Sequence, residues 1–360
     1  MENFGLDSQQ WSGLVARLGG EEALTASARE RRAFLRARGV KSAADVLRFA
    51  FMYGPGGYSL RSLAASASAR GLADVSDVAI LDRLKGSADW LQSLCEERLA
   101  HAAQAVGAQT LGRPIRIVDG SRIEGPGGRA WRLHLCYDPA LGRIVEAVVT
   151  PAKEGERLDR LAVTPGEIRL GDRAFPQPNG VKNTLGAGAD VLVRVTWNSL
   201  KLTDAADKPL DWLALFEAAA AQGSLETPVR LHKARGRFEP IAMRLSIIKK
   251  PPAAAIAARA KARRASRKDQ HRTDPRTLAG AEHVVLLTSL DREQFPTERL
   301  AALYRLRWQI ELALKRLKSI LHIDRLPAKD PDLARAWLNA HLLFALLLDE
   351  TIVALDAISP

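Results

Sequence analysis

Near residue 110 the hydrophobic pattern of the chain changes from a helical period to a strand period, and this change constrains the fold more than any other feature. Residues 1–107 have the apolar spacing of helices joined by short turns. Five later runs are rich in apolar and β-branched residues, as strands are: 115–119, 131–137, 144–150, 168–172 and 190–195. A helix is expected over residues 156–163. This order predicts a mixed α/β region that follows an all-helical one.

The order of the predicted strands indicates an RNase H-like core, because three antiparallel strands precede a helix and further strands beside the first. After residue 196, short strand-like runs surround a predicted helix over residues 210–221, and a buried strand over residues 284–289 then resumes the core. The prediction is an α/β fold: an RNase H-like core with a β-rich insertion, plus an all-helical N-terminal domain. Its expected parts are a helical domain (1–107), the first part of the core (108–196), the insertion with a basic arm (197–279), the second part of the core (280–328) and a C-terminal helix (329–360).

The charge of the chain indicates a polyanionic partner. Lys and Arg total 53 against 41 Asp and Glu, which gives a net charge of +12, and cations that neutralise phosphates release condensed counterions. Two thirds of this excess lies in residues 249–276, the basic arm, which hold ten Lys or Arg and two Asp. A solvated charged helix is the alternative interpretation of such a run. Its concentration in one segment favours an arm that contacts nucleic-acid phosphates.

Two of the predicted N-terminal helices have the outline of a helix-turn-helix. Ser59 can cap a helix that runs to about residue 70, Gly71 can end it, and Ser76 can cap a second helix to Leu84. Any two helices of a bundle share this outline, so a simple bundle remains the alternative to DNA binding.

The rest of the composition excludes several classes of protein. Two cysteines, Cys95 and Cys136, cannot supply a disulfide framework or a Cys-based zinc cluster. The seven histidines show no i, i+4 pair, so a zinc site is not expected. Residues 1–5 do not resemble a signal peptide, and the apolar run at residues 342–348 is far too short for a membrane span. We expect a cytoplasmic protein without membrane contact.

Three carboxylates are distinguished by their positions. Asp119 and Asp172 are expected at strand ends, where the adjacent Gly120 and Gly171 would let a backbone or a phosphate approach. Glu311 lies on a long helix expected over residues 296–321. On the helical wheel, the polar residues near Glu311 form a band that lies beside the apolar stripe of the helix and not opposite it. Glu311 is therefore expected at the rim of the domain. The band also holds Tyr304, Arg307 and Lys318, and the stripe holds Leu303, Ile310, Leu314, Leu317 and Leu321.

Three oxygen ligands without a His or Cys cluster fit Mg²⁺ or Mn²⁺. Two such ions about 4 Å apart would activate a water or a 3′-hydroxyl and stabilise the leaving oxygen of a phosphodiester. Asp119, Asp172 and Glu311 are therefore the predicted catalytic and metal-binding residues, and they are expected to converge within metal-bridging reach.

These residues resemble the motifs of a known family. The pattern Tyr304-x2-Arg307-x3-Glu311-x6-Lys318 resembles the Y-R-E-K signature of the "insertion sequence four" family of bacterial DDE transposases. Residues 118–121 and 171–175 resemble the first and second aspartate motifs of that family. A β-rich insertion between the second Asp and the Glu is also typical of it.

The resemblance implies a nucleoid-associated transposase that binds terminal inverted repeats, cuts double-stranded DNA and joins it to target DNA. It further implies a DNA hairpin intermediate, a homodimer on paired ends and a DNA-binding N-terminal domain. Some members stack a flipped base on a tryptophan just before the strand that corresponds to residues 284–288, and this chain has none there. Trp131 and Trp308 are expected to pack in the core.

The predicted DNA-binding residues lie on the long helix, after Asp172 and in the basic arm. They are Tyr304, Arg307, Lys315, Lys318, Arg173, Arg259, Lys261, Arg263, Arg264, Arg267 and Lys268. The arm is expected to be mobile until it binds DNA. Two alternatives remain, an RNase H-like nuclease without strand transfer and a non-catalytic DNA-binding repressor, and the three intact carboxylates weigh against the repressor.

Overall fold

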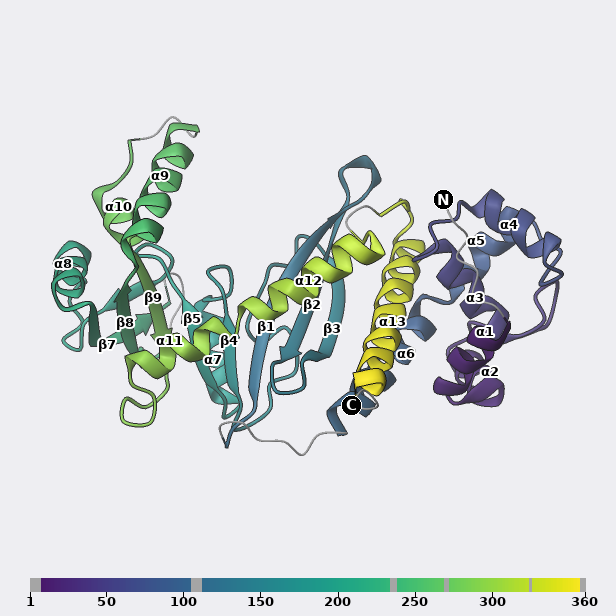
Figure 1. The fold of residues 1–360 in the computed structure, drawn as a ribbon, viewed down its shortest axis with the longest axis horizontal. Helices are drawn as coiled ribbons and strands as arrows, with labels where there is room; N and C mark the ends of the chain where they lie inside the picture. The colour runs from purple at the N-terminus through teal and green to yellow at the C-terminus, as the bar shows by residue number, and fades with distance from the viewer. Residues whose placement is uncertain (1–7, 105–111, 234–237, 269–271, 324–325, 357–360) are drawn as a thin grey trace.

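A computed structural model describes residues 8–104, 112–233, 238–268, 272–323 and 326–356. It is a mixed α/β structure in which one long sheet carries helices on both faces, with further helices of the N-terminal region at one end (Figure 1). The predicted α/β class is therefore confirmed. No helix within the described ranges is long and apolar enough to cross a membrane.

The sheet has nine strands in the order β3-β2-β1-β4-β5-β9-β8-β7-β6. Strands β1, β2 and β3 pair antiparallel, whereas β4 and β5 extend the sheet parallel to β1. The bounds are β1 (Ile115–Glu124), β2 (Ala130–Asp138), β3 (Arg143–Pro151), β4 (Ile168–Gly171), β5 (Asp190–Arg194), β6 (Lys201–Thr203), β7 (Ser224–His232), β8 (Ile241–Lys249) and β9 (His283–Thr288). The five strands expected before residue 196 are confirmed, although β1 continues past Asp119 to Glu124.

The strands of the predicted insertion belong to the same sheet. Strand β9 pairs antiparallel with β5 on one side and with β8 on the other, so that Thr288 has Leu192 and Arg244 as its two neighbours. Strands β7 and β6 then continue the sheet outward. Helix α8 (Trp212–Gln222), capped by Asp211, packs on β7 and β8. Continuous pairing thus connects the insertion to the core.

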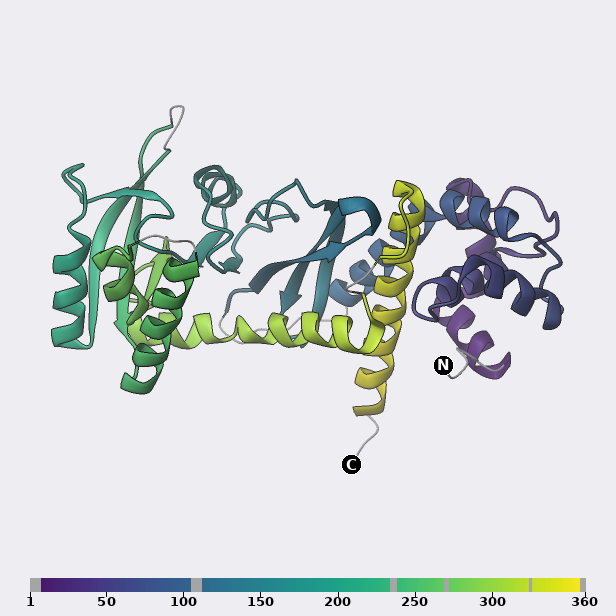
Figure 2. The ribbon, with the colours of Figure 1, turned by 90° about the horizontal axis from the view of Figure 1, so that it is seen from above.

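Two hydrophobic clusters lie on the two faces of the sheet. On one face Ile117 and Leu170 pack with α11 (Thr297–Arg305), α12 (Trp308–Leu321) and the N-terminal helices. On the other face Val118 and Phe175 pack with α7 (Pro178–Gly186) and α8. Figure 2 shows α11 and α12 along one face of the sheet.

The long helix expected over residues 296–321 is two helices. Between α11 and α12, the amides of Leu306, Arg307 and Gln309 donate to carbonyls three residues back, a tighter turn than an α-helix. The backbone of Leu306 and Arg307 stays in the right-handed helical region, so the two helices follow almost one line (Figure 2). The side chains of the expected stripe that are described, Leu303, Ile310 and Leu314, are buried.

Helix α13 (Pro331–Asp356) joins the N-terminal helices to the sheet. It packs on α3, α5 and α6 on one side and on β3 and α12 on the other. The N-terminal helices are α1 (Ser8–Arg17), α2 (Gly20–Glu30), α3 (Ala43–Tyr53), α4 (Leu60–Ala69), α5 (Asp77–Gly86) and α6 (Ala88–Gln104). Ser59 and Ser76 cap α4 and α5 as predicted. The domain boundary expected at residue 107 lies outside the described residues.

The helix expected over residues 156–163 is wrong, because residues 152–167 form turns and irregular structure. Arg169, whose side chain is 1% exposed, donates to the carbonyls of Leu158 and Leu161 and to that of Ala162. It also pairs with the equally buried Glu167. A buried guanidinium therefore takes the carbonyls that a helix would have satisfied within itself.

Replacing Arg169 should destabilise the protein strongly. Arg169→Ala leaves the Glu167 carboxylate buried without its partner and three carbonyls without a donor, and such a change costs ~3–5 kcal/mol. Urea unfolding should show a lower free energy of unfolding, with Arg122→Ala, which breaks the exposed Arg122–Glu124 pair, as the control that changes little. Equal effects of the two changes would contradict this role for Arg169.

Candidate active site

The pairing of β1 with β4 places Asp119 beside Asp172. Ile117 lies opposite Leu170 in the parallel register, and each aspartate follows its strand partner by two residues. Since side chains alternate along a strand, Asp119 shares the face of Ile117, which is the face that α12 covers. Asp172 follows the last residue of β4 directly. The two predicted aspartates therefore meet at one end of β4.

Hydrogen bonds orient both carboxylates. The amide of Gly120 donates to Asp119 Oδ1 at 2.7 Å, and the amide of Ala174 donates to Asp172 Oδ1 at 2.8 Å. The side chain of Asp119 is only 15% exposed. Burial, together with the nearby charge of Asp172, raises the pKa of Asp119 to about 6, although the Gly120 amide and Arg307 oppose the shift. The site is thus short of positive charge.

Glu311 is connected to this pair through Arg307. The guanidinium of Arg307 lies with Nη1 3.8 Å from Asp119 Oδ2, and its Nη2 donates to Glu311 Oε1. The Glu311 side chain is 55% exposed at the first turn of α12. Within the described residues no three His, Cys, Asp or Glu side chains stand close enough to hold a metal ion together. The structure therefore brings Asp119 and Asp172 together and holds Glu311 on the far side of Arg307.

The residues present fit a divalent cation. All three expected ligands are carboxylates, which are the donors that hard cations prefer. Burial, and to a lesser extent the charge of Asp172, disfavour the charged form of Asp119 and raise its pKa, and a cation bound there would stabilise that charged form. Glu311 is exposed and separated from Asp119 by one guanidinium, so it could join only when Arg307 moves aside.

The other residues predicted to act along the long helix differ in their exposure. Tyr304 is partly buried against the hydrophobic cluster below α11 and α12, and the Arg307 guanidinium lies 5.8 Å from the centroid of its ring. Lys315 and Lys318 are exposed on α12. Trp308 is 56% exposed, so its expected place in the core is wrong; its position on the wheel faces away from the sheet. Trp131 is half-buried against the cluster that includes α12.

A cationic pocket opens next to the second aspartate. Its volume is about 420 Å³, and its lining contains four cations and no carboxylate. The residues that define its chemistry are Arg173, Arg194, Trp197, Lys250, Lys261 and His283. Burial, with the nearby charges of Arg194 and Arg173, lowers the pKa of Lys250 to about 8. This pocket is therefore short of negative charge.

The basic arm forms two helices that project from the end of the sheet, α9 (Pro252–Lys268) and α10 (Pro275–Ala281) (Figure 1). None of the described side chains of α9 is buried. Lys261 faces the pocket, whereas Arg259 pairs with Glu282 at 2.5 Å. The other predicted cations of α9 are exposed: Arg263, Arg264, Arg267 and Lys268. Residues 269–271 of the arm lie outside the described residues.

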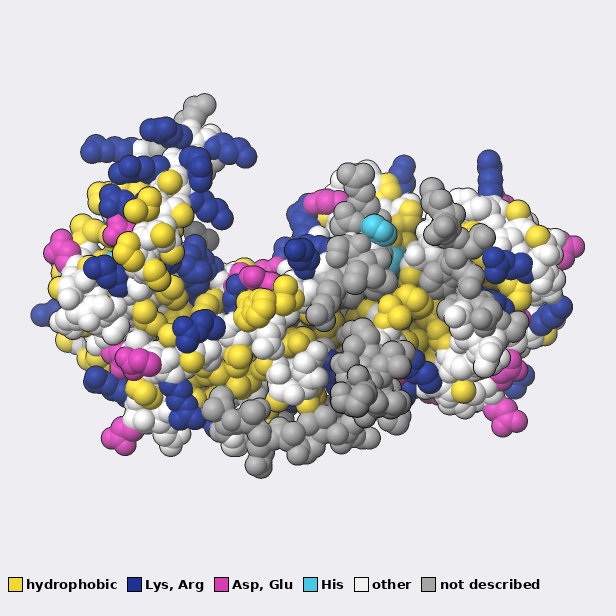
Figure 3. Space-filling model, viewed as in Figure 1, with side chains coloured by type: hydrophobic (Ala, Val, Ile, Leu, Met, Phe, Trp, Pro, Cys, Tyr) yellow, Lys and Arg dark blue, Asp and Glu magenta, His cyan; other side chains and the backbone are white. Residues whose placement is uncertain are grey.

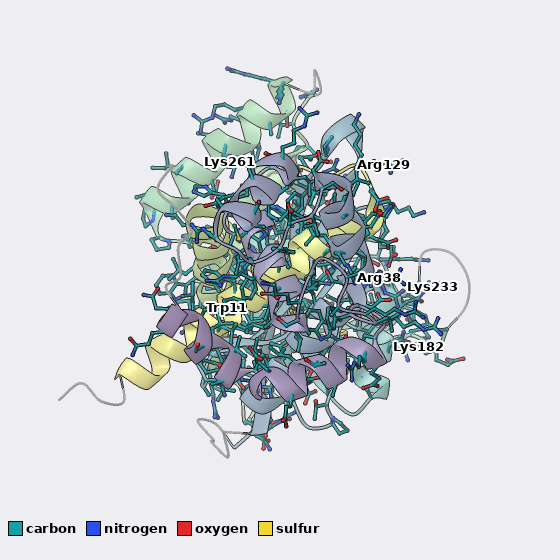
Figure 4. The ribbon with its side chains drawn as sticks, turned by 90° about the vertical axis from the view of Figure 1, so that its right-hand side faces the viewer. Trp11, Arg38, Arg129, Lys182, Lys233 and Lys261 are labelled. Atoms are coloured by element: carbon teal, nitrogen blue, oxygen red, sulfur yellow. The ribbon has the colours of Figure 1, made fainter. Side chains whose placement is uncertain are left out.

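The surface is hollowed between this arm and the β1–β2 hairpin, and basic side chains crowd the arm (Figure 3). Seen end-on, Lys261 of α9 and Arg129 of the hairpin lie on the same upper side of the molecule (Figure 4). Helix α12 runs between the two (Figure 1).

Sequence reasoning misjudged the two glycines beside the aspartates. A Cβ on Gly120 would lie 2.6 Å from Glu156 Oε1, and one on Gly171 would lie 2.8 Å from the Cβ of Phe175. Both positions are filled by protein side chains, so neither leaves room for a phosphate. Glu156, Arg194 and Lys250 were also missed. For Glu156, the one signal in the sequence was Gly120, because a glycine after Asp119 indicates that another group approaches the backbone closely at that position.

Comparison with known proteins adds independent findings. Residues 110–348 match the family model described as Transposase DDE domain. A protein of Escherichia coli strain K12, named as the proposed transposase InsL for insertion sequence element IS186A, is 40% identical over 347 residues, which cover 95% of this chain and 94% of that protein. The transposase for insertion sequence element IS421 of Escherichia coli is 40% identical over 348 residues, with the same coverage.

The raised pKa of Asp119 predicts a pH dependence for the metal-free protein. Because the folded state holds this proton up to about pH 6 and the unfolded chain only to about 3.8, stability from this group falls as pH rises from about 4 to 6. Asp119→Asn should remove that part of the slope. Urea unfolding with a chelator at pH 4.5 and 7.5 measures it, and Asp82→Asn on the exposed side of α5 is the control. An identical slope in the wild type and Asp119→Asn would refute the assignment.

Proposed function

This chain belongs to the DDE transposase family, whose members are DNA-cleaving and transposing enzymes, and we propose that it transposes an insertion sequence element related to IS186 and IS421. It would bind the terminal inverted repeats, cut the DNA at the element's ends and join those ends to target DNA. The observation that carries the proposal is the pair Asp119 and Asp172, short of positive charge, beside a pocket short of negative charge.

We propose roles for the residues of this site. Asp119, Asp172 and, once Arg307 moves, Glu311 would hold Mg²⁺ or Mn²⁺ as two ions. The bound ions would polarise the phosphodiester and lower the pKa of the attacking water or 3′-hydroxyl. Arg307 and Tyr304 would then orient the cleaved strand at α12, with Lys315 and Lys318 further along the helix. Arg173 would hold the strand where it passes from Asp172 to the cationic pocket.

The proposal extends to the organisation of the chain. The order β3-β2-β1-β4-β5, with its antiparallel and parallel pairs, supports an RNase H-like core over residues 108–196 and 280–328. Residues 1–107 would bind the terminal repeat, and residues 197–279 would supply the basic arm. Residues 329–360 would join the N-terminal helices to the core. The Tyr304 to Lys318 pattern supports membership of the "insertion sequence four" group. Two chains would act together on paired ends.

The products of a DNA cleavage and joining assay distinguish a transposase from a nuclease and from a repressor. A labelled terminal repeat incubated with Mn²⁺ and a target plasmid should give cut ends and joined products, and a covalently closed end would reveal the hairpin intermediate. Cleavage without joining would support a nuclease, and binding without cleavage would support a repressor.

Glu311→Gln should abolish cleavage and leave binding of the terminal repeat nearly unchanged. The change removes a proposed metal ligand and leaves Arg307 in place. Gel-shift and cleavage assays on the same labelled end measure both effects. Arg307→Ala should weaken both, because a charge-assisted phosphate contact contributes ~1.5–3 kcal/mol. Parallel loss of binding and cleavage in Glu311→Gln would mean that Glu311 supports the structure instead.

Neutralising the basic arm should flatten the salt dependence of DNA binding. The slope of log K against log salt should shrink by about 0.9 for each DNA phosphate that the arm no longer neutralises. The variant replaces six cations with Gln: Arg259, Lys261, Arg263, Arg264, Arg267 and Lys268. Fluorescence anisotropy of a labelled duplex at several salt concentrations measures the slope.

The control replaces two exposed cations outside the arm, Lys201 and Lys208 on and just after the edge strand β6, with Gln. Its slope should remain close to the wild-type value, because neither lysine belongs to the basic arm or lines the cationic pocket. A slope in the six-residue variant that equals the wild-type slope would make the arm an ordinary solvated helix.

A further inference from the structure

Glu156 is a carboxylate that the proposed mechanism does not use, although it abuts the first aspartate. It lies in the irregular segment between β3 and β4, and its carboxylate occupies the space of the side chain that Gly120 lacks. A Cβ on Gly120 would lie 2.6 Å from Glu156 Oε1 and 2.8 Å from its Cγ. Gly120 directly follows Asp119 and donates the hydrogen bond that orients it. Glu156 therefore packs against the backbone that sets the position of Asp119.

Two further contacts fix Glu156 in this position. Arg132 of β2 pairs with its carboxylate, and the two side chains are 19% and 13% exposed. The main-chain carbonyl of Glu156 accepts a hydrogen bond of 2.8 Å from Gln177 Nε2. Gln177 is the N-cap residue of α7 and lies five positions after Asp172, beyond the turn at residues 173–174. Glu156 thus connects the backbone after Asp119 with the segment that follows Asp172.

The electrostatic position of Glu156 matches this geometry. Burial raises the pKa of Glu156, Arg132 opposes the shift, and the charge of Asp172 adds to it. The charge of Glu156 in turn contributes to the raised pKa of Asp119. A protein that only needed to fill the space beside Gly120 could use an apolar side chain. A third partly buried negative charge costs free energy in the metal-free state and increases the attraction for a cation.

We propose that Glu156 is a positioning residue for the metal-binding aspartates, holding Asp119 and Asp172 at their spacing and adding negative charge to the cation site. It does so from the opposite face of the sheet, through the gap at Gly120, and Arg132 keeps it there. The inference rests on the proposed function, because it requires that the two aspartates bind a divalent cation.

Glu156→Gln tests the charge separately from the shape. Gln has nearly the same volume and can still accept a hydrogen bond from Arg132, so only the charge is removed. The affinity of the DNA-free protein for Mn²⁺ can be measured from the electron paramagnetic resonance signal of the free ion. In Glu156→Gln this affinity should fall by about 10-fold or more, as is typical when a group that supports metal ligands is changed. Glu154→Gln is the control, because Glu154 pairs with Arg160 instead and should leave Mn²⁺ affinity unchanged.

Gly120→Ala tests the contact without changing any charge. The new methyl group would displace the Glu156 carboxylate, so Mn²⁺ affinity should fall in the wild-type background. In a Glu156→Ala background the space is open, and adding Gly120→Ala should have little further effect. A decrease of the same size in both backgrounds would show that the contact is irrelevant, and would overturn the inference even if Glu156→Gln did not fold.

The outcomes separate this inference from the proposed function. One outcome would overturn the role of Glu156 alone: Asp119→Asn abolishes Mn²⁺ binding, but Glu156→Gln changes the Mn²⁺ affinity by less than twofold. A wild-type protein that bound no Mn²⁺, or bound it equally well after Asp119→Asn, would overturn the metal site and this inference together.

Discussion

The parallel pairing of β1 with β4 is the interaction on which the site depends. It covers three residue pairs, and the two aspartates follow its last pair, Ile117 and Leu170, by two residues each. A slip of one residue would turn one carboxylate to the opposite face of the sheet. Burial on both faces prevents this, because Ile117 and Leu170 are fully buried on one side and Val118 is buried on the other. The register that packs the core is the register that places the carboxylates together.

Two sites of opposite charge then lie side by side, the carboxylates Asp119 and Asp172 and the cationic pocket beside them. Burial and Asp172 raise the pKa of Asp119 to about 6, so the carboxylate site lacks positive charge even with Arg307 nearby. Burial, Arg194 and Arg173 lower the pKa of Lys250 to about 8, so the adjacent pocket lacks negative charge. A divalent cation would relieve the first and a phosphodiester backbone the second. A basic chain with an acidic centre is the charge pattern that these two ligands require together.

Local patterns in the sequence predicted the strands before residue 196, the caps of α4 and α5 and the position of Asp172 at the end of β4, whereas Asp119 lies within β1 and not at its end. They failed where a distant residue decides the local structure. Residues 156–163 have helical character, but Arg169, buried with Glu167, binds their carbonyls and holds them in turns. The gap at Gly120 is filled by Glu156, 36 positions later in the sequence, and no local pattern connects the two. Trp308 was expected in the core, whereas its side chain is 56% exposed, on the side of α12 that faces away from the sheet.

The two ends of the molecule are attached to the carboxylates in different ways. Helix α13 packs on α3, α5 and α6 and also on β3 and α12, so one hydrophobic cluster extends from the N-terminal helices to the face that bears Asp119. A change in their relative position would therefore expose buried apolar surface, which costs ~25 cal/mol per Å². Helix α9, by contrast, has no buried residue among those described, and Arg259 connects it to Glu282 by a partly exposed ion pair. If the N-terminal helices bind the terminal repeat as proposed, that DNA would be held at a fixed distance from the carboxylates, whereas a phosphate ligand on α9 could shift that helix without disturbing the core.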